Sequence, residues 1–513
     1  MRAFAVSNRI RFADGASAQA FDAKMRALFD ARLRGGDLVQ PDVDDVASHL
    51  LGPDDPADPV RTARDLVVFT EDVGLILAFQ GEKAAALRDP GLATLQAFLG
   101  LGVAWLPQTL LSLASFDGVS LNRALTLALT DALWRPFVDT FARLADDYDV
   151  YLVAATDVAD AWLSTNPLDV ALFGDPEHPE RGDVYRPADA NVWNQAVIFD
   201  PDGRIVDRTR KIYLTPPEED PTLLDLAFGD LRDLRVVTTP VGKLGVLISK
   251  DAWMADVVDR IDQLGADVIV QPDANPGAWA SYLENGDTVW YPENWKAGNW
   301  VHVQRFPSLR HNVTPMMTGN LFDFAFDGQG AIVSDATAQE RPLGFVGSVP
   351  DVGFRAVGRW AIADPGARDP RLDVSERRRV LAERSRAMAP GSGSPLENAY
   401  GESVIWADLA IPVASRAEAT APATLPPATR VASSAAAQWN PSIAVSDDGV
   451  VHVAWIDFRG GNADVYAARS TDHGATFGSP VRVDDGGEAR PDHQDDLWGA
   501  RLAVGVTGRV HVA

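Results

Sequence analysis

The chain has 513 residues, of which 46% are hydrophobic and 23% are charged. This composition is ordinary for a globular protein and excludes a mostly disordered chain. Acidic residues outnumber basic ones by 72 to 46, and the formal net charge of −26 disfavours nucleic acid and anionic lipid as partners. Cysteine is absent, which excludes disulfides, thiolate metal sites and a cysteine nucleophile.

Three regions of the chain differ in composition. Residues 1–412 alternate short β-rich runs with helical ones, which predicts an α/β fold whose sheets are covered by helices. Residues 413–438 are predicted to be an extended linker, because 419–437 consist almost wholly of Ala, Pro, Thr and Ser. Residues 439–513 show the alternation typical of β-strands. No secretory signal is seen at the N-terminus, so a cytoplasmic location is expected.

The segment 90–116 contains no charged residue and is long enough to span a bilayer. A buried helix pair broken at Pro107 explains the same composition, because proline interrupts a helix. Polar and helix-breaking residues stand near the centre of the segment, so a membrane-associated segment is the less favoured alternative.

The C-terminal region contains an internal repeat. Segment 443–454 recurs at 502–513, and Gly449 and His452 correspond to Gly508 and His511 at an offset of 59 residues (449 to 508). Between the copies, residues 470–477 resemble the Asp-box of sialidase-type β-propellers, in which Asp472 would close a tight turn. The resemblance implies an incomplete propeller that continues in a longer protein and binds glycans or proteins. A short β-rich tail with a coincidental repeat is the alternative.

Three segments of the first region each place a reactive type of residue at or near the end of an apolar strand. Glu71 follows Leu-Val-Val-Phe-Thr, Lys211 stands in Arg-Lys-Ile-Tyr-Leu, and Ser249 follows Gly-Val-Leu-Ile. Strand ends are where such folds expose functional groups. Taken singly, each residue has an ordinary interpretation, as a turn carboxylate, a surface lysine or a helix-capping serine.

Together, the three segments resemble the nitrilase superfamily of carbon–nitrogen hydrolases. Their order and context match the family, in which a nucleophilic cysteine occupies the position of Ser249. The resemblance covers nearly all of residues 1–412. It implies a four-layer αββα sandwich, an acyl-enzyme mechanism on a small amide or nitrile, no metal or other cofactor, and a homodimer.

The resemblance also implies a role for each matched residue. Glu71 would be the general base, and Lys211 with the backbone N–H of Lys250 would stabilise the oxyanion. A second glutamate of the family lies a few residues after the lysine, and Glu219 is preferred to Glu218 for this position. The candidates for the substrate pocket are Asp251, Asn275 and Trp279, although packing is the favoured role for the tryptophan-rich region around 279.

A serine in place of the cysteine changes the chemistry. An alcohol is a weaker acid than a thiol by several pKa units, and each unit is worth about 1.4 kcal/mol. Three functions therefore stay open: a hydrolase acting through Ser249, an inactive binding module that keeps the pocket, and an acyltransferase relative. The hydrolase hypothesis predicts that Glu71, Lys211 and Ser249 lie within hydrogen-bond reach of one another.

Overall fold

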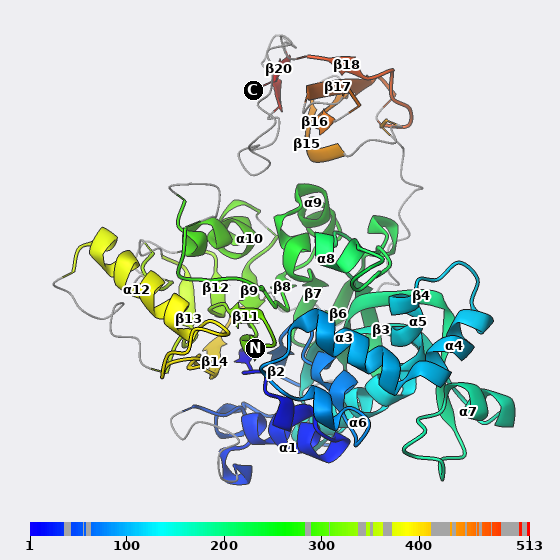
Figure 1. Cartoon of the computed structure of the whole chain (residues 1–513). Coiled ribbons are helices and arrows are strands. Elements are labelled where there is room, and N and C mark those ends of the chain that lie inside the picture. The colour runs from blue at the N-terminus through cyan, green and yellow to red at the C-terminus, as the bar shows by residue number, and fades with distance from the viewer. Residues whose placement is uncertain are drawn as a thin grey trace. The chain divides into compact units, whose positions relative to one another are not determined.

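The computed structural model (Figure 1) describes residues 1–34, 43–54, 56–57, 63–282, 289–306, 308–336, 345–348, 352–362, 372–411, 431–432, 438–446, 449–457, 459–460, 464–472, 474–483, 502–504 and 510–512. The chain divides into two compact units. The first comprises 1–253, 261–283 and 288–422, and the second comprises 254–260, 284–287 and 423–513. The predicted linker 413–438 lies outside the described residues, except for 431–432 and 438.

Two six-stranded sheets form the framework of the first unit. The first sheet has the strand order β14 (Ser403–Asp408), β1 (Arg2–Ser7), β2 (Asp65–Phe69), β3 (Tyr151–Ser164), β4 (Val184–Phe199) and β5 (Ile205–Arg210). The second has the order β13 (Phe354–Val357), β12 (Ala331–Ser334), β9 (His311–Thr314), β8 (Val268–Val270), β7 (Gly242–Val246) and β6 (Val236–Thr239). Strands β1, β2 and β3 are parallel to one another, as are β7, β8 and β9.

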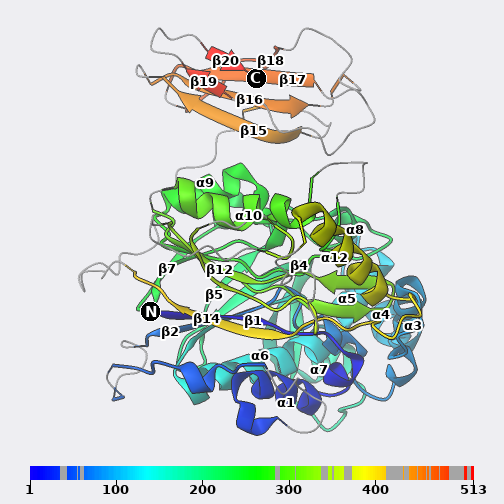
Figure 2. The same cartoon turned by 90° about the vertical axis from the view of Figure 1, so that its left-hand side faces the viewer.

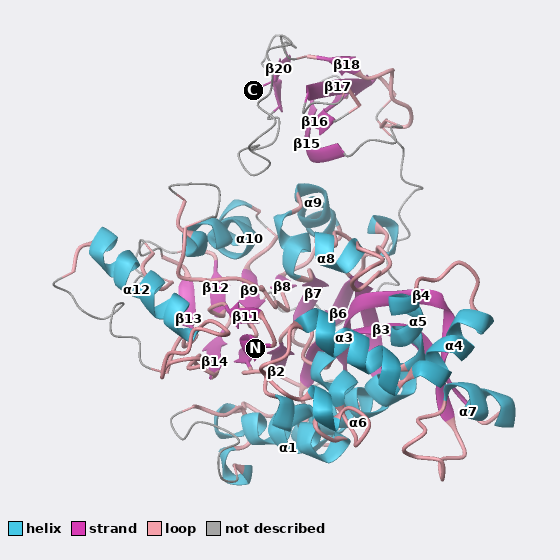
Figure 3. Cartoon of the chain, in the orientation of Figure 1, coloured by secondary structure: helices cyan, strands magenta, loops and turns pink. Residues whose placement is uncertain are grey.

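The two sheets pack face to face. Their inner faces share an apolar core of small and β-branched side chains, among them Ala5, Val68, Val153, Val246, Val270 and Val313. The outer face of the first sheet packs on α1 (Ala18–Phe29) and α6 (Thr130–Tyr148), and that of the second on α10 (Tyr291–Arg305) and α12 (Val374–Met388). These layers are visible in Figures 2 and 3. The predicted α/β sandwich is therefore confirmed.

Helix α1 shows how local sequence produces this covering layer. The Ser17 hydroxyl accepts a hydrogen bond from the backbone N–H of Ala20 at 3.1 Å and so caps the helix. Phe21, Met25 and Leu28 then recur on one helical face and are buried against the first sheet. Further elements are α5 (Leu121–Ala128), α7 (Pro167–Phe173), α8 (Pro216–Glu219), α9 (Ala255–Gln263) and the hairpin β10 (Thr318–Leu321) and β11 (Phe324–Asp327).

The charge-free segment forms two helices, α3 (Thr94–Ala104) and α4 (Leu106–Ser115), with a bend of 80° between them. The break falls at Trp105, and Pro107 stands in the first turn of α4. Proline is tolerated there because a backbone N–H in the first turn has no partner within the helix. The prediction that this pair is buried is wrong. Large aliphatic side chains are exposed along it: Leu95 60%, Leu99 62%, Val103 74%, Leu106 46% and Leu110 52%.

Helix length and hydropathy bear on the membrane alternative for this segment. Among the described residues, no single helix is long and apolar enough to cross a membrane. Helices α3 and α4 meet the criteria of length and composition only when they are taken together as a bent pair.

The described residues from 438 to 512 form an all-β region. Strands β15 (Gln438–Val445), β16 (Val451–Asp457), β17 (Asp464–Ser470) and β18 (Val481–Arg482) form an antiparallel meander, and β19 (Leu502–Val504) pairs with β20 (Val510–Val512). After β17, Asp472 Oδ1 accepts a hydrogen bond from the backbone N–H of Thr476 at 2.8 Å, which closes a turn. The closed propeller itself stays a prediction.

Candidate active site

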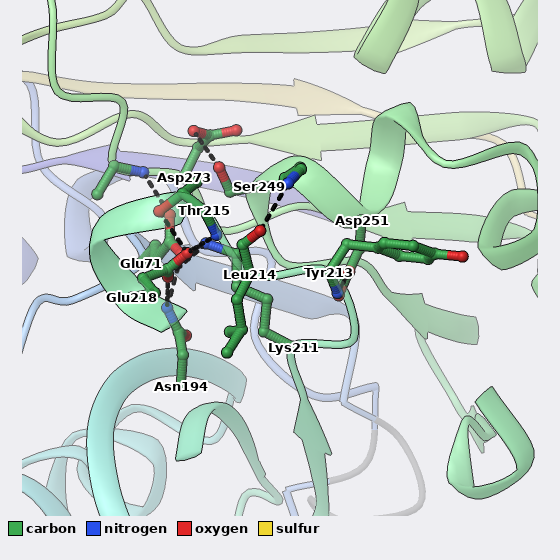
Figure 4. Close-up of polar contacts among 12 residues, drawn as sticks. Glu71, Asn194, Lys211, Tyr213, Leu214, Thr215, Glu218, Ser249, Asp251 and Asp273 are labelled. Carbon is green, nitrogen blue, oxygen red and sulfur yellow. Dashed lines mark hydrogen bonds and ion pairs between the residues drawn. The ribbon is translucent and has the colours of Figure 1, made fainter. Parts of the chain in front are cut away.

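The candidate site lies where strands of both sheets end (Figure 4). Glu71 stands just past β2, Lys211 directly follows β5, and Ser249 begins a 3-10 turn after β7. Glu71 Oε2 accepts a hydrogen bond from the backbone N–H of Ala274, which follows β8 of the opposite sheet, at 3.0 Å. The site therefore joins the two sheets through a buried carboxylate.

Lys211 lies between two carboxylates. Its Nζ is 2.7 Å from Glu71 Oε1 and 2.7 Å from Glu218 Oε1, and Asn194 Nδ2 donates to the same two oxygens at 2.7 and 3.1 Å. Burial alone would lower the pKa of Lys211, but the charges of Glu71 and Glu218 outweigh it and hold that pKa above its usual value. Lys211 is thus a cation, suited to stabilise negative charge and unsuited to act as a base.

The glutamate that contacts Lys211 is Glu218, whereas Glu219 is exposed. The prediction that Glu219 is the second glutamate beside Lys211 is therefore wrong. Thr215 caps α8, and the N–H and hydroxyl of Thr215 donate to Glu218 Oε2 at 2.5 and 2.7 Å. This arrangement is a capping box, in which a Glu three residues after the capping Thr bonds back to it. The sequence Thr-Pro-Pro-Glu has this spacing and would have indicated Glu218.

The pair Glu218 and Glu219 allows a matched test of this assignment. Glu218→Gln should lower the free energy of unfolding by about 1–3 kcal/mol, because it removes a charged acceptor from the buried Lys211. Glu219→Gln should change it by less than about 0.5 kcal/mol, as is usual for an exposed site. Urea unfolding of both variants at neutral pH is the measurement, and equal losses would contradict the assignment.

Ser249 is held in an unusual backbone conformation and does not bond to Glu71. Its φ is +46°, in the left-handed region that non-glycine residues seldom adopt, and such strain concentrates at functional sites. Its Oγ donates to Asp273 Oδ1 at 3.2 Å. Of the three residues expected to lie within hydrogen-bond reach of one another, Glu71 and Lys211 do so. The hydroxyl of Ser249 instead bonds to Asp273, a carboxylate that the sequence analysis did not identify (Figure 4).

The residues that follow Ser249 hold the neighbouring chain in place. Lys250 Nζ donates to the carbonyl oxygen of Leu214 at 2.6 Å. Asp251 is buried and accepts hydrogen bonds from the backbone N–H groups of Ile212, at 3.0 and 3.1 Å, and Tyr213, at 2.8 Å. Burial raises the pKa of Asp251 to about 7. The prediction of Asp251 as a pocket residue is wrong, because its carboxylate instead fixes the segment after Lys211.

The two other pocket candidates differ from each other. Trp279 is fully buried and packs edge-on against Tyr291, Trp295 and Phe345, at ring distances of 5.7, 5.7 and 5.6 Å. Trp279 thus belongs to the core, in line with the packing role favoured for this tryptophan-rich region, and it does not line a pocket. Asn275 accepts a hydrogen bond at Oδ1 from the Tyr291 hydroxyl at 2.6 Å, and its buried Nδ2 has no acceptor among the described residues. Asn275 therefore keeps an unused donor two residues after Asp273.

A second acidic pair, Asp72 and Asp157, lies beside Glu71. Asp157 is buried and Asp72 is half-buried, and both Asp157 carboxyl oxygens have no hydrogen-bond partner among the described residues. Neighbouring carboxylates without donors disfavour each other's charged form. Burial raises the pKa values of Asp72 and Asp157 well above the usual range, and the charges of neighbouring carboxylates add to this effect.

This pair should make stability depend on pH. A carboxyl group whose pKa is raised in the folded state contributes stability at low pH that is lost as the pH rises through that folded pKa. Asp157→Asn keeps the size of the side chain and removes its titration. We therefore expect it to match wild type in free energy of unfolding at pH 5 and to exceed it at pH 8. Urea titrations at both pH values are the measurement, and a constant difference would contradict the raised pKa of Asp157.

A cavity lies apart from these groups. It has a volume of about 530 Å³ and is lined along β5 and the loop at 230–235 by charged side chains, among them Asp160, Asp207, Arg208, Arg210 and Arg235. Asp160 forms ion pairs with both Arg208 and Arg210, so this charge is largely balanced within the cavity wall. Among the described residues, no group of three or more His, Asp or Glu side chains is arranged to hold a metal ion.

The described geometry defines an α/β sandwich with a buried Glu–Lys–Glu cluster at the ends of its strands. Residues 103–306 match the family described as carbon–nitrogen hydrolase. The matched region contains Lys211, Glu218, Ser249 and Asp273. No curated protein matches the chain.

Solved structures of low sequence identity resemble the fold. A carbon–nitrogen hydrolase from Helicobacter pylori G27 is 15% identical over 70% of this chain and 87% of its own, with a TM-score of 0.37. A mutant of the Nesterenkonia AN1 amidase is 16% identical over 65% and 83%, with a TM-score of 0.34. Saccharomyces cerevisiae Nit3, of branch 10 of the nitrilase superfamily, is 15% identical over 65% and 82%, with a TM-score of 0.33.

Proposed function

We propose that the first unit hydrolyses the carbon–nitrogen bond of a small amide or nitrile through an acyl-enzyme on Ser249. The observation that carries the proposal is the Lys211 ammonium, held buried as a cation between Glu71 and Glu218 at the strand ends where Ser249 also lies. A fixed positive charge in a water-poor site stabilises a developing oxyanion far better than one in bulk water. The match of residues 103–306 to carbon–nitrogen hydrolases supports the same reaction class.

The strained backbone at Ser249 gives independent support. A left-handed φ costs a non-glycine residue roughly 1–2 kcal/mol, and the surrounding structure must hold it there. The turn carries the hydroxyl past the end of β7, and Ser249 is only partly buried, which leaves it open to a substrate. Glu71 would orient Lys211 and activate water in the second half of the reaction.

The test is a panel of short aliphatic and aromatic amides and nitriles, read by release of ammonia or amine. The full chain should convert at least one member, and mass spectrometry under rapid quench should find an acyl adduct on the peptide that contains Ser249. An adduct on any other residue, or turnover without one, would reject Ser249 as the nucleophile.

A second candidate function is a binding module without turnover. The observation that favours it is the hydroxyl of Ser249, which bonds to Asp273 and not to Glu71, the residue that resembles the base of the family. This candidate predicts that an amide binds to wild type and Ser249→Ala with equal affinity in calorimetry and that neither protein releases product. A homodimer and a cytoplasmic location remain proposals for either function.

For the second unit we propose a propeller blade built on the 59-residue repeat (449 to 508). The support is the register of its hairpins. In β15–β16, Ile443 pairs with Val453, and in β19–β20, Leu502 pairs with Val512, which are the same positions of the repeat. A complete propeller of this type would bind a glycan or a protein beside the hydrolase.

A further inference from the structure

We propose that Asp273 is the general base that takes the proton of Ser249, so that this site works as a Ser–Asp pair with Lys211 as the oxyanion cation. The inference rests on the proposed function and adds a catalytic residue to it. Asp273 Oδ1 is the hydrogen-bond acceptor of Ser249 Oγ at 3.2 Å. A general base must lie within hydrogen-bond reach of the proton that it removes, and among the described carboxylates it is Asp273 that meets this condition.

The position of Asp273 follows from the pairing of β7 with β8. These strands are parallel, with Val246 beside Val270, and Ser249 and Asp273 keep the same separation of 24 residues. The backbone continues the pairing past the strand ends, because Ser249 N–H donates to the carbonyl oxygen of Pro272 at 3.1 Å. Main-chain hydrogen bonds thus place Asp273 beside Ser249, so their contact is part of the fold.

Glu71 is less able to take this proton. Its Oε1 already accepts hydrogen bonds from Lys211 and Asn194, and its Oε2 accepts one from the backbone of Ala274. Both oxygens of Glu71 are thus occupied by other donors, and Ser249 Oγ does not donate to either of them. Burial raises the pKa of Glu71, and Lys211 and Asn194 offset part of that rise.

Asp273 lies in a different environment. It is wholly buried, and burial, followed by the charge of Glu71, raises its pKa well above the usual range. The groups that face Asp273 are Glu71, Lys211, Ser249 and Gln271, whose Nε2 donates to Oδ2 at 3.3 Å, together with Tyr291. In its ionised form, a carboxylate of raised pKa accepts the proton of an alcohol more readily than an ordinary carboxylate does, which is what a serine nucleophile requires.

The reaction on an amide then balances in two halves. The proton of Ser249 moves to Asp273 as Oγ bonds to the carbonyl carbon, and the carbonyl electron pair moves to the oxygen beside Lys211. The C–N bond breaks, the carbonyl re-forms, and the leaving nitrogen takes the proton from Asp273. Water then adds to the acyl-serine and gives up one proton, and Oγ leaves with a proton to restore Ser249. The sum is amide plus water giving carboxylic acid plus amine.

The test measures Ser249 directly and needs no known substrate. A fluorophosphonate probe phosphonylates activated serines, so its rate of attachment to Ser249 reports how readily the hydroxyl loses its proton. Asp273→Asn should slow this rate by about 10²–10⁴-fold, the usual contribution of a general base. Asp327→Asn is the matched control, because Asp327 is an equally buried carboxylate that accepts from Trp279 N–H and the Ser385 hydroxyl and lies outside the site.

A second pair of variants separates chemistry from folding. In a Ser249→Cys background, Asp273→Asn should slow alkylation by iodoacetamide by less than about tenfold, because a thiol with a pKa near 8.5 needs far less help to ionise. If the probe labels Ser249 as fast in Asp273→Asn as in wild type, Asp273 is not the general base, and the proposed function still stands. If wild type is not labelled at Ser249 and converts no amide or nitrile, both the role of Asp273 and the proposed function are rejected.

Discussion

Ser249→Ala should abolish amide turnover, with a loss of about 10⁶-fold if Ser249 is the nucleophile, because no other step can replace the covalent bond to Oγ. The variant should fold normally. The hydroxyl makes one hydrogen bond of 3.2 Å to Asp273, whose net contribution to stability is about 1 kcal/mol. The measurements are steady-state product release and the urea midpoint, taken on the same preparation.

Ser249→Gly is the matched control for backbone strain. The φ of +46° suits glycine and disfavours alanine, so Ser249→Gly should be more stable than Ser249→Ala by about 1 kcal/mol while being equally inactive. Activity and stability should therefore change independently across the two variants. Turnover within about tenfold of wild type in both variants would show that Ser249 is not the nucleophile.

Ser249→Cys distinguishes the hydrolase from the binding module. A thiol of pKa about 8.5 would need little help from Asp273 to ionise. Turnover in Ser249→Cys that wild type lacks would reject the Ser249 hydrolase and support an inactive module. Turnover in both proteins would show that either a hydroxyl or a thiol at position 249 can act as the nucleophile.

The sequence allowed the strand-end residues to be predicted because that signal is local. An apolar run followed by a polar residue marks the end of a buried strand, and Glu71, Lys211 and Ser249 all occupy such positions. The alternation of apolar runs and helices predicted sheets covered by helices, whereas the sandwich was an implication of the resemblance to the nitrilase superfamily. Local signals do not report which side chains meet across the sandwich.

Two residues of the site illustrate why the rest was missed. Choosing Glu218 over its neighbour Glu219 required the capping box of Thr215 to be recognised, since both residues are glutamates on one short helix. Finding Asp273 required the register of β7 and β8, because a shift of one residue would turn the side chain to the other face. In helices α3 and α4, an apolar composition predicted burial, although five large aliphatic side chains there are exposed.

Lys211→Met should lower the free energy of unfolding by about 3–5 kcal/mol at pH 8, a larger loss than we expect from Glu218→Gln or Ser249→Ala. The substitution leaves Glu71 and Glu218 buried, close together and without their cation. At pH 5 the loss should be smaller, because the two carboxyl groups can then take up protons and no longer repel each other. Urea unfolding at both pH values measures this difference.

The matched control is Lys24→Met. Lys24 forms another buried ion pair, with Nζ 2.5 Å from Glu402 Oε1 and side-chain exposures of 1% and 2%, at a position that does not include Ser249 or Asp273. Both lysine variants should lose a similar amount of stability, because each substitution leaves a buried carboxylate without its cation. If Lys211 stabilises the oxyanion, then at 10 °C, where both variants are still folded, Lys211→Met should lose turnover by at least about 10²-fold and Lys24→Met should keep it. Equal activity in the two variants would limit Lys211 to holding the fold together.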